Sequence, residues 1–243
     1  MKIIKYKKMS NNKYKVFLDN GENIQLHENI ILKYNLLLTK QIEDINKIKK
    51  DNNSYLIYDK VLKYISIKMR CEKEIRDYLK KNEIDNIDEI IEKLKEQGFI
   101  NERLYTKSYI SDKTRLNNVG PNKIRNDLIK LNIDKNIIEE ELSNIDQDDI
   151  NITLEKLVDK KIKSNKTYAG DVLKQKILND LINKGYSKES ILSILDKKDL
   201  NNDDLYEKEY SKLYNKYSKK YSGSELEYFI KQKLYSKGIK KSN

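Results

Sequence analysis

The chain has 243 residues, of which 37% are charged, and it contains only seven glycines and one proline. So few turn-forming residues argue against an all-β or linker-rich architecture and favour long helices with solvated faces. The formal net charge of +11 favours an acidic partner, either nucleic acid or a protein assembly that contains it.

Cys71 and His27 are the only residues of their types, which excludes an internal disulfide and a zinc site of the usual Cys/His kind. The glycines form no phosphate-binding loop, and His27 has no serine or cysteine motif nearby, so we expect a packing or surface histidine. No stretch reaches the roughly 18 to 20 apolar residues of a membrane span, and residues 1–5 (MKIIK) lack the apolar segment that is typical of a signal peptide. We therefore expect a cytoplasmic monomer with no cofactor, no metal, no membrane partner and no enzymatic activity.

Residues 1–53 differ from the rest of the chain and predict a small β-hairpin followed by short helices. Predicted strands at 13–18 and 23–27 flank the segment Asp19-Asn20-Gly21-Glu22. Asn20-Gly21 predicts a type I′ turn, in which both central residues have positive φ. Residues 3–6 are a candidate third strand, and residues 28–50 predict a short helix, a turn and a second helix.

One pattern, an isoleucine followed four residues later by a leucine, occurs four times along the rest of the chain. The pairs are Ile75/Leu79, Ile124/Leu128, Ile177/Leu181 and Ile230/Leu234. Because each unit buries its apolar stripe only partly alone, such units stack on one another. The fold class predicted is mainly α, with tandem three-helix repeats in an elongated curved array after the N-terminal region. The predicted repeats cover residues 54–100, 101–146 and 147–199, with a partial repeat at 200–243.

Within the first repeat, apolar spacing predicts helices at about 56–69, 71–82 and 86–97, and Gly98 is suited to follow the last helix. Pro121 suits the first helical position of a later helix, and Gly185 suits the end of another. The fourth repeat holds two helices before Gly238. One face of its first helix is aromatic, and we expect that face to pack against the preceding repeat rather than on bases: Tyr206, Tyr210, Leu213, Tyr214 and Tyr217.

All five arginines lie in the first two predicted repeats, although the chain otherwise uses lysine as its cation. The planar guanidinium binds carboxylates and phosphates through two parallel hydrogen bonds. The sequence therefore predicts a partner-binding set formed by Lys68, Arg70, Arg76, Arg103, Arg115, Lys123 and Arg125. The alternative is that the arginines form intramolecular salt bridges, with neighbours such as Glu72 and Asp77.

Three ordered segments carry a family resemblance: residues 64–75 (YISIKMRCEKEI), 98–105 (GFINERLY) and 120–128 (GPNKIRNDL). Together they resemble the RecX family of RecA regulators, and the resemblance covers nearly the whole chain, including the N-terminal hairpin region of the longer members. Lys68 stands where the family often has arginine, Met69 where many longer members have proline, and Cys71 where serine or threonine is usual. Because cysteine lacks a strong acceptor, we expect a looser helix start at Cys71.

The resemblance implies a regulator that binds the RecA filament on single-stranded DNA, along its helical groove. Such a protein opposes filament growth, strand exchange, ATP turnover by RecA and cleavage of the SOS repressor during DNA repair. One alternative is a nonspecific DNA-binding helical protein that does not need RecA. Another is a Mg²⁺-dependent nuclease that uses Asp148-Asp149 and Asp203-Asp204, but these acids fall where helices begin, and carboxylates there stabilise the helix.

Overall fold

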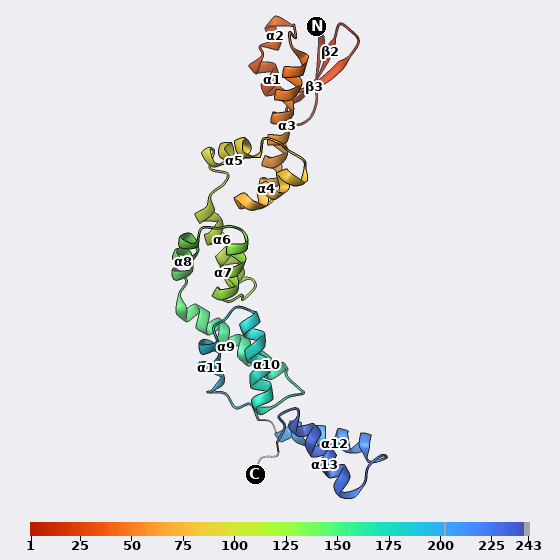
Figure 1. Ribbon diagram of the computed structural model, residues 1–243, viewed down its shortest axis with the longest axis vertical. Helices are drawn as coiled ribbons and strands as arrows, with labels where there is room; N and C mark the ends of the chain where they lie inside the picture. Colours follow the sequence, from red (N-terminus) through yellow and green to blue (C-terminus); the bar gives the residue numbers. More distant parts are fainter. Residues whose placement is uncertain (202, 241–243) are drawn as a thin grey trace. The chain divides into compact units, whose positions relative to one another are not determined.

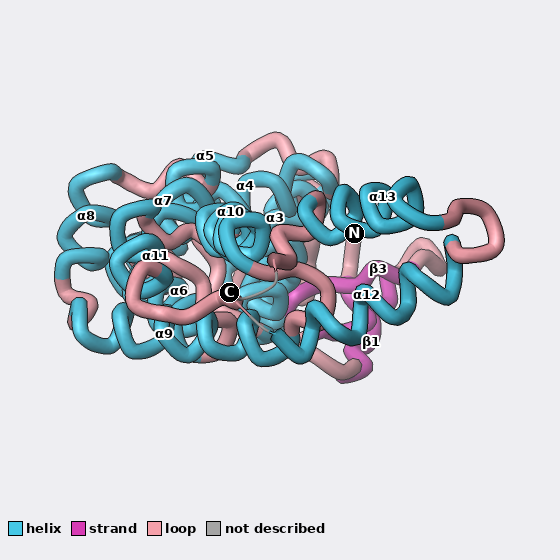
Figure 2. The backbone as a smooth tube through the Cα atoms, turned by 90° about the horizontal axis from the view of Figure 1, so that it is seen from below, coloured by secondary structure: helices cyan, strands magenta, loops and turns pink. Residues whose placement is uncertain are grey.

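The computed structural model describes residues 1–201 and 203–240. In these residues the fold is mainly helical, with one N-terminal three-stranded antiparallel sheet, as the sequence predicts. Figure 2 colours that sheet magenta and the helices cyan. The chain forms two compact units, Met1–Asn101 and Glu102–Asn243.

The sheet consists of β1 (Ile3–Lys8), β2 (Lys13–Leu18) and β3 (Asn23–His27), in that spatial order. The predicted hairpin and third strand are both confirmed. The type I′ turn is wrong, because four residues separate β2 from β3 and only Gly21 among them has positive φ, at +83°. Its N–H donates to the carbonyl of Leu18 at 3.1 Å, so this longer loop needs left-handed backbone at one residue only.

Three helices follow the sheet: α1 (Glu28–Lys33), α2 (Leu36–Thr39) and α3 (Ile45–Ile67). The sequence predicts two separate helices where the structure has the single helix α3, so a break near residue 53 is wrong. The first half of α3 packs on the sheet through Ile48, and its second half packs on the next helices through Val61. Figure 1 shows α3 running from the sheet to α4 and α5.

Asn52 explains why α3 continues through a polar stretch. Its side-chain oxygen accepts from the N–H of His27 at 2.7 Å, and its amide nitrogen donates to the carbonyl of Gln25 at 2.9 Å. These bonds satisfy the open edge of β3. His27 is 3% exposed, accepts from the N–H of Asn29 through Nδ1, and stacks on Tyr55, so it is a packing and capping residue.

The remaining helices come in groups. They are α4 (Glu72–Lys81) and α5 (Ile87–Glu96), which join α3 in the first repeat; α6 (Glu102–Arg115), α7 (Pro121–Lys130) and α8 (Lys135–Ser143); α9 (Gln147–Ser164), α10 (Gly170–Asn183) and α11 (Lys188–Leu195); and α12 (Asp203–Tyr217) and α13 (Gly223–Tyr235). Pro121 opens α7 as predicted. The boundaries of the predicted domains stay a prediction.

The four isoleucine–leucine pairs lie on the middle helices of the first three groups and on α13. All eight side chains are at most 3% exposed, which confirms them as core positions. In each group the N–H of the fifth residue after the leucine donates back to the leucine carbonyl, closing a Schellman turn. The four bonds are Ile84 to Leu79, Ile133 to Leu128, Tyr186 to Leu181 and Ile239 to Leu234, at 3.2, 3.2, 3.1 and 3.0 Å.

The residue before each of these donors has left-handed backbone. Glu83 and Asn132 have φ of 56° and 59°, and Gly185 and Gly238 have φ of 98° and 73°. The repeat is therefore longer than the isoleucine–leucine pattern and includes the turn that ends the helix.

In the second unit, the Schellman turn of one repeat bonds to the repeat before it. The N–H of Gly120 donates to the carbonyl of Lys184 at 2.9 Å, and the N–H of Ala169 donates to that of Lys237 at 3.0 Å. Both glycines of these turns are in close contact. A Cβ on Gly185 would lie 2.5 Å from the Cβ of Lys123, and one on Gly238 would lie 2.2 Å from the carbonyl oxygen of Ala169.

The aromatic face of α12 packs on protein, but mainly on the core that it shares with α13 of the same group. The predicted packing on the preceding repeat is therefore wrong for most of this face, because Ala169 is the one described residue of that core from the preceding repeat. Tyr206, Tyr210, Leu213 and Tyr217 pack on that core, whereas Tyr214 is 47% exposed. The predicted acid pairs do fall at helix starts. Asp148 and Asp149 lie in the first turn of α9, and α12 begins at Asp203.

Candidate partner-binding surfaces

Two of the predicted cations lie just before α4. Glu74 holds them, because its carboxylate is 3.2 Å from Nη1 of Arg70 and 3.5 Å from Nζ of Lys68. The Arg70 guanidinium also lies 4.1 Å from the centre of the Tyr64 ring. Its side chain is only 16% exposed, whereas that of Lys68 is 59% exposed. Lys68 is therefore the more accessible cation for a partner.

The start of α4 is better capped than the cysteine at its N-cap leads us to expect. Glu74 accepts from the N–H of Cys71 at 3.1 Å, and the Cys71 thiol completes a capping box with the N–H of Glu74. Burial alone would raise the pKa of Glu74, but this backbone bond and the nearby Lys68 and Arg70 outweigh it and lower the pKa. The Glu74 carboxylate thus provides, at this helix start, the strong hydrogen-bond acceptor that a cysteine thiol lacks.

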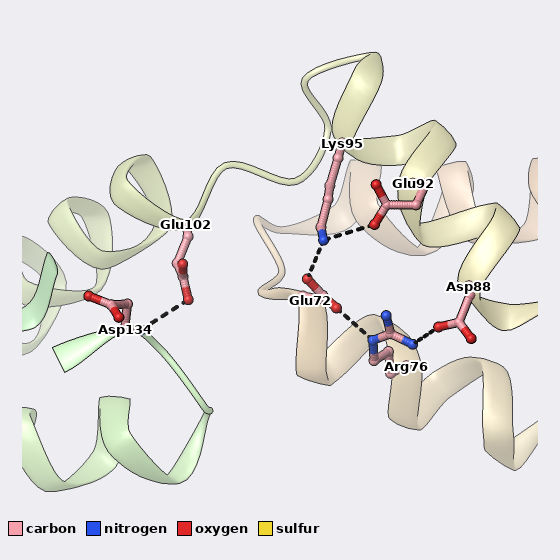
Figure 3. A network of polar contacts seen from close by, with 7 residues as sticks. All are labelled: Glu72, Arg76, Asp88, Glu92, Lys95, Glu102 and Asp134. Atoms are coloured by element: carbon pink, nitrogen blue, oxygen red, sulfur yellow. Dashed lines mark hydrogen bonds and ion pairs between the residues drawn. The ribbon is translucent and has the colours of Figure 1, made fainter. Parts of the chain in front are cut away.

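Arg76 joins α4 to α5 (Figure 3). Its Nε donates to Glu72 and its Nη1 to Asp88, both at 2.6 Å, while Lys95 bridges Glu72 and Glu92 at 3.1 and 3.0 Å. Burial would raise the pKa of Glu72, but the hydrogen bonds from Arg76 and Lys95 outweigh it and lower the pKa. Arg76 therefore forms an intramolecular salt bridge with Glu72, as the alternative interpretation of the arginines predicts.

Arg103 and Arg125 bind neighbouring glutamates of α8. Arg103 donates to the two carboxylate oxygens of Glu140 at 2.5 and 2.8 Å, and Arg125 donates to those of Glu139 at 2.6 and 2.9 Å. The bond from Arg125 lowers the pKa of Glu139. Bidentate hydrogen bonds of this kind hold a guanidinium in one orientation. The two arginines thus tie α6 and α7 to α8.

Arg115 and Lys123 differ from the other five predicted residues. Neither makes an ion pair or a side-chain hydrogen bond with any residue that the structure describes. Both side chains are exposed, Lys123 in the first turn of α7 and Arg115 at the end of α6. Their charges are therefore available to a partner without breaking an internal bond.

Arg115 also lines a cleft of about 860 Å³ between α6 and α9 in the second unit. One wall carries Lys107, Ser111 and Arg115, which are four residues apart on α6, and the other carries Asp149, Thr153 and Lys156 of α9. Lys107 and Lys156 are not among the residues that the sequence predicts for partner binding. Their helical spacing is visible in the sequence, but the pairing of α6 with α9 is not.

The fold defines the class of this protein, a helical-repeat protein with exposed cations on its surface. Among the described residues, no group of three histidines, cysteines or acids could hold a metal ion, and no helix is both long and apolar enough to cross a membrane.

Comparisons with known proteins name the family. Residues 58–94 match the family model described as RecX, first three-helix domain. The curated regulatory protein RecX of Lactococcus lactis is 34% identical over 91% of this chain and 86% of its own length. That of Streptococcus gordonii is 31% identical over 98% and 95%. The chain therefore belongs to the RecX family of regulatory proteins, which confirms the resemblance.

Solved structures agree on the fold. A crystal structure of a regulatory protein RecX superposes with a TM-score of 0.65 over 81% of this chain and 99% of its own, at 24% identity. The crystal structure of RecX from Lactobacillus salivarius has a TM-score of 0.52 at 30% identity, covering 58% and 92%. These two structures thus share the helical fold over the parts of the chain that they cover.

Proposed function

We propose that this protein is a regulator, chiefly an inhibitor, of the RecA recombinase. It acts as a cytoplasmic monomer that binds the RecA filament on single-stranded DNA and restrains filament assembly, strand exchange, ATP turnover and repressor cleavage. The observation that carries this proposal is the match to proteins named regulatory protein RecX over 91% and 98% of the chain. The protein would act by binding, without catalysis of its own.

The predicted cations support this proposal to different degrees. Lys68, Arg115 and Lys123 would contact acidic surfaces of the filament directly, since they are exposed. Arg70, Arg76, Arg103 and Arg125 would contribute mainly by holding the helices, because a new partner would have to replace their internal carboxylates. Removing one partner of such a pair leaves the other charge uncompensated.

Co-sedimentation tests the proposal directly. RecA is assembled on single-stranded DNA with a slowly hydrolysed ATP analogue, and the protein is added at physiological salt. We expect it to sediment with the filament and not with the same DNA lacking RecA. Equal binding to bare DNA, lost as salt rises, would contradict the proposal, because counterion release governs nonspecific DNA binding.

Two substitutions on α7 separate contact from structure. Lys123→Glu should weaken filament binding while leaving the unfolding midpoint unchanged, because Lys123 has no internal partner among the described residues. Arg125→Glu should lower the midpoint, because it places a carboxylate against Glu139. Unchanged filament binding by Lys123→Glu, with its fold intact, would remove Lys123 from the contact set.

Direct DNA binding without RecA is a second candidate function, and α13 favours it. Tyr228 and Tyr235 are 68% and 70% exposed, and Lys231 lies between them on the same side of the helix. Exposed aromatic rings with nearby cations provide stacking sites for single-stranded bases. If this candidate is correct, alanine at both tyrosines will weaken binding to oligo(dT) in the absence of RecA.

A further inference from the structure

The cleft between α6 and α9 contains cations that the rest of the protein does not neutralise. Lys107, Arg115 and Lys156 line it, and none of the three forms an ion pair with a described residue. The other four arginines of the chain all bind carboxylates. The arginine without such a partner is therefore the one placed at the cleft.

The acids of the cleft are largely engaged. Glu141 is 8% exposed on its side chain and lies 3.2 Å from Nη1 of Arg103. Asp146 caps α9 by accepting from the N–H of Asp148 at 2.8 Å. Asp149, in the first turn of α9, is left as the acid that opposes the three cations. The cleft thus favours an anionic group near Arg115 and disfavours one near Asp149.

The size and lining of the cleft distinguish two anions that it could bind, an acidic peptide and a nucleic acid strand. A volume of about 860 Å³ lies within the range of sites that enclose a small ligand or a short segment. Isoleucines at 110, 145 and 150 provide apolar surface, and Ser111 and Thr153 provide groups that bond peptide amides.

A nucleic acid strand fits this lining poorly. Its phosphates would pass Asp146 and Asp149, and strands are bound on exposed aromatic rings. The aromatic residue here, Tyr186, is 4% exposed and donates to the carbonyl of Asn118 at 3.2 Å; burial raises its pKa to about 12. The cleft therefore suits a peptide with one or more carboxylates.

We propose that this cleft binds an extended acidic peptide segment of the protein partner, with a carboxylate on Arg115 and with Lys107 and Lys156 beside it. A guanidinium binds a carboxylate through two parallel hydrogen bonds, and apolar side chains of the segment cover the isoleucines. The identity of the partner as RecA rests on the proposed function, whereas the acidic peptide chemistry rests on the cleft alone.

The first test uses a synthetic peptide, so that it does not depend on RecA. A glutamate-rich peptide of about ten residues, long enough to span a site of this size, is titrated into the isotopically labelled full-length protein. We expect shifts of the backbone amide signals of Ser111, Asn118 and Thr153. Arg115→Glu should weaken the affinity about tenfold or more, which corresponds to roughly 1.4 kcal/mol. Asp149→Asn should strengthen it.

Lys188→Glu is the matched control, because it makes the same change of charge at an exposed position of α11 outside the cleft. It should leave peptide affinity within about twofold of the original, a change well under 1 kcal/mol. Peptide shifts away from the cleft, or equal affinity of Arg115→Glu and the unchanged protein, would overturn the proposal. Competition of oligo(dT) for the same amides would make the cleft a nucleic acid site instead.

The second test links the cleft to the partner. Binding of the same variants to RecA without DNA, and to RecA filaments, should fall for Arg115→Glu and stay constant for Lys188→Glu. If the unchanged protein does not bind RecA but the peptide result holds, the proposed function fails and the cleft proposal stands. If RecA binds both variants equally while the peptide requires Arg115, the cleft serves a different protein.

Discussion

The first two repeats and the last two end a helix in the same backbone turn, but the left-handed residue of that turn differs between them. In the first two, Arg76 and Arg125 tie the middle helix to the third helix, and the left-handed residues are Glu83 and Asn132. In the last two, the left-handed residues are Gly185 and Gly238, which press on the backbone of the preceding repeat. Side chains thus hold the helices within a repeat, and a missing Cβ permits the contact between repeats.

Substitutions in the isoleucine–leucine pairs, which all four repeats share, should lower the free energy of unfolding most. Leu128 is fully buried at the end of α7, and its carbonyl closes the Schellman turn with Ile133. Leu128→Ala should lower the free energy of unfolding by about 2–5 kcal/mol, because it leaves a cavity in a small core. Urea denaturation measures this. Ile129→Ala, at a neighbour that is 41% exposed, is the control and should cost much less.

The glycine contact between repeats predicts the next largest effect. Gly185→Ala should cost about 2–4 kcal/mol, since it combines a left-handed backbone with a Cβ forced against another chain segment. Gly98→Ala is the matched control. Gly98 also has positive φ, at +74°, but nothing lies within 4 Å of the added Cβ. Equal losses in the two variants would show that backbone strain alone, not the close contact, requires glycine at Gly185.

How far the sequence predicts this fold depends on whether a feature is local. The isoleucine–leucine pairs, Pro121 and the hairpin depend on neighbours in the sequence, and all are found. The sequence does not predict the continuity of α3, because Asn52, Asn53 and Ser54 are weak helix formers. Asn52 is kept in the helix by its bonds to Gln25 and His27, and that contact depends on the fold.

The sequence predicts the candidate site only in part, again because contacts between distant residues are not visible in it. The sequence places every arginine, but it does not place the carboxylates that bind them 12, 14 and 37 residues away at Asp88, Glu139 and Glu140. For the same reason it could not tell Arg115, which lines a cleft, from Arg103, which is paired. Composition identifies the cations, and only the packing of α6, α8 and α9 shows which of them are available.

The arginine ion pairs predict a dependence of stability on pH. Folding lowers the pKa values of Glu72 and Glu139, so the unfolded chain binds more protons than the folded chain in acid. The stabilisation is present above the unfolded pKa of about 4.3 and is lost as pH falls through the lower folded values. Urea midpoints should therefore drop on acidification, and Glu139→Gln should make that drop shallower. A parallel drop in both proteins would contradict a role for Glu139.

The smallest effect that we expect concerns Glu83. Among the left-handed residues of the four Schellman turns, glutamate is the residue type least suited to positive φ. Glu83 is exposed, makes no side-chain hydrogen bond or ion pair with any described residue, and has φ of 56°. Glu83→Gly relieves roughly 1–2 kcal/mol of left-handed strain, but it also frees the unfolded chain by about 0.5–1 kcal/mol. A net gain of about 0.5 kcal/mol should result. Asn132→Gly should gain less, because asparagine tolerates left-handed backbone better than glutamate does. If neither variant is stabilised, the turns of the first two repeats are not strained, and the glycines of the last two serve the contact between repeats alone.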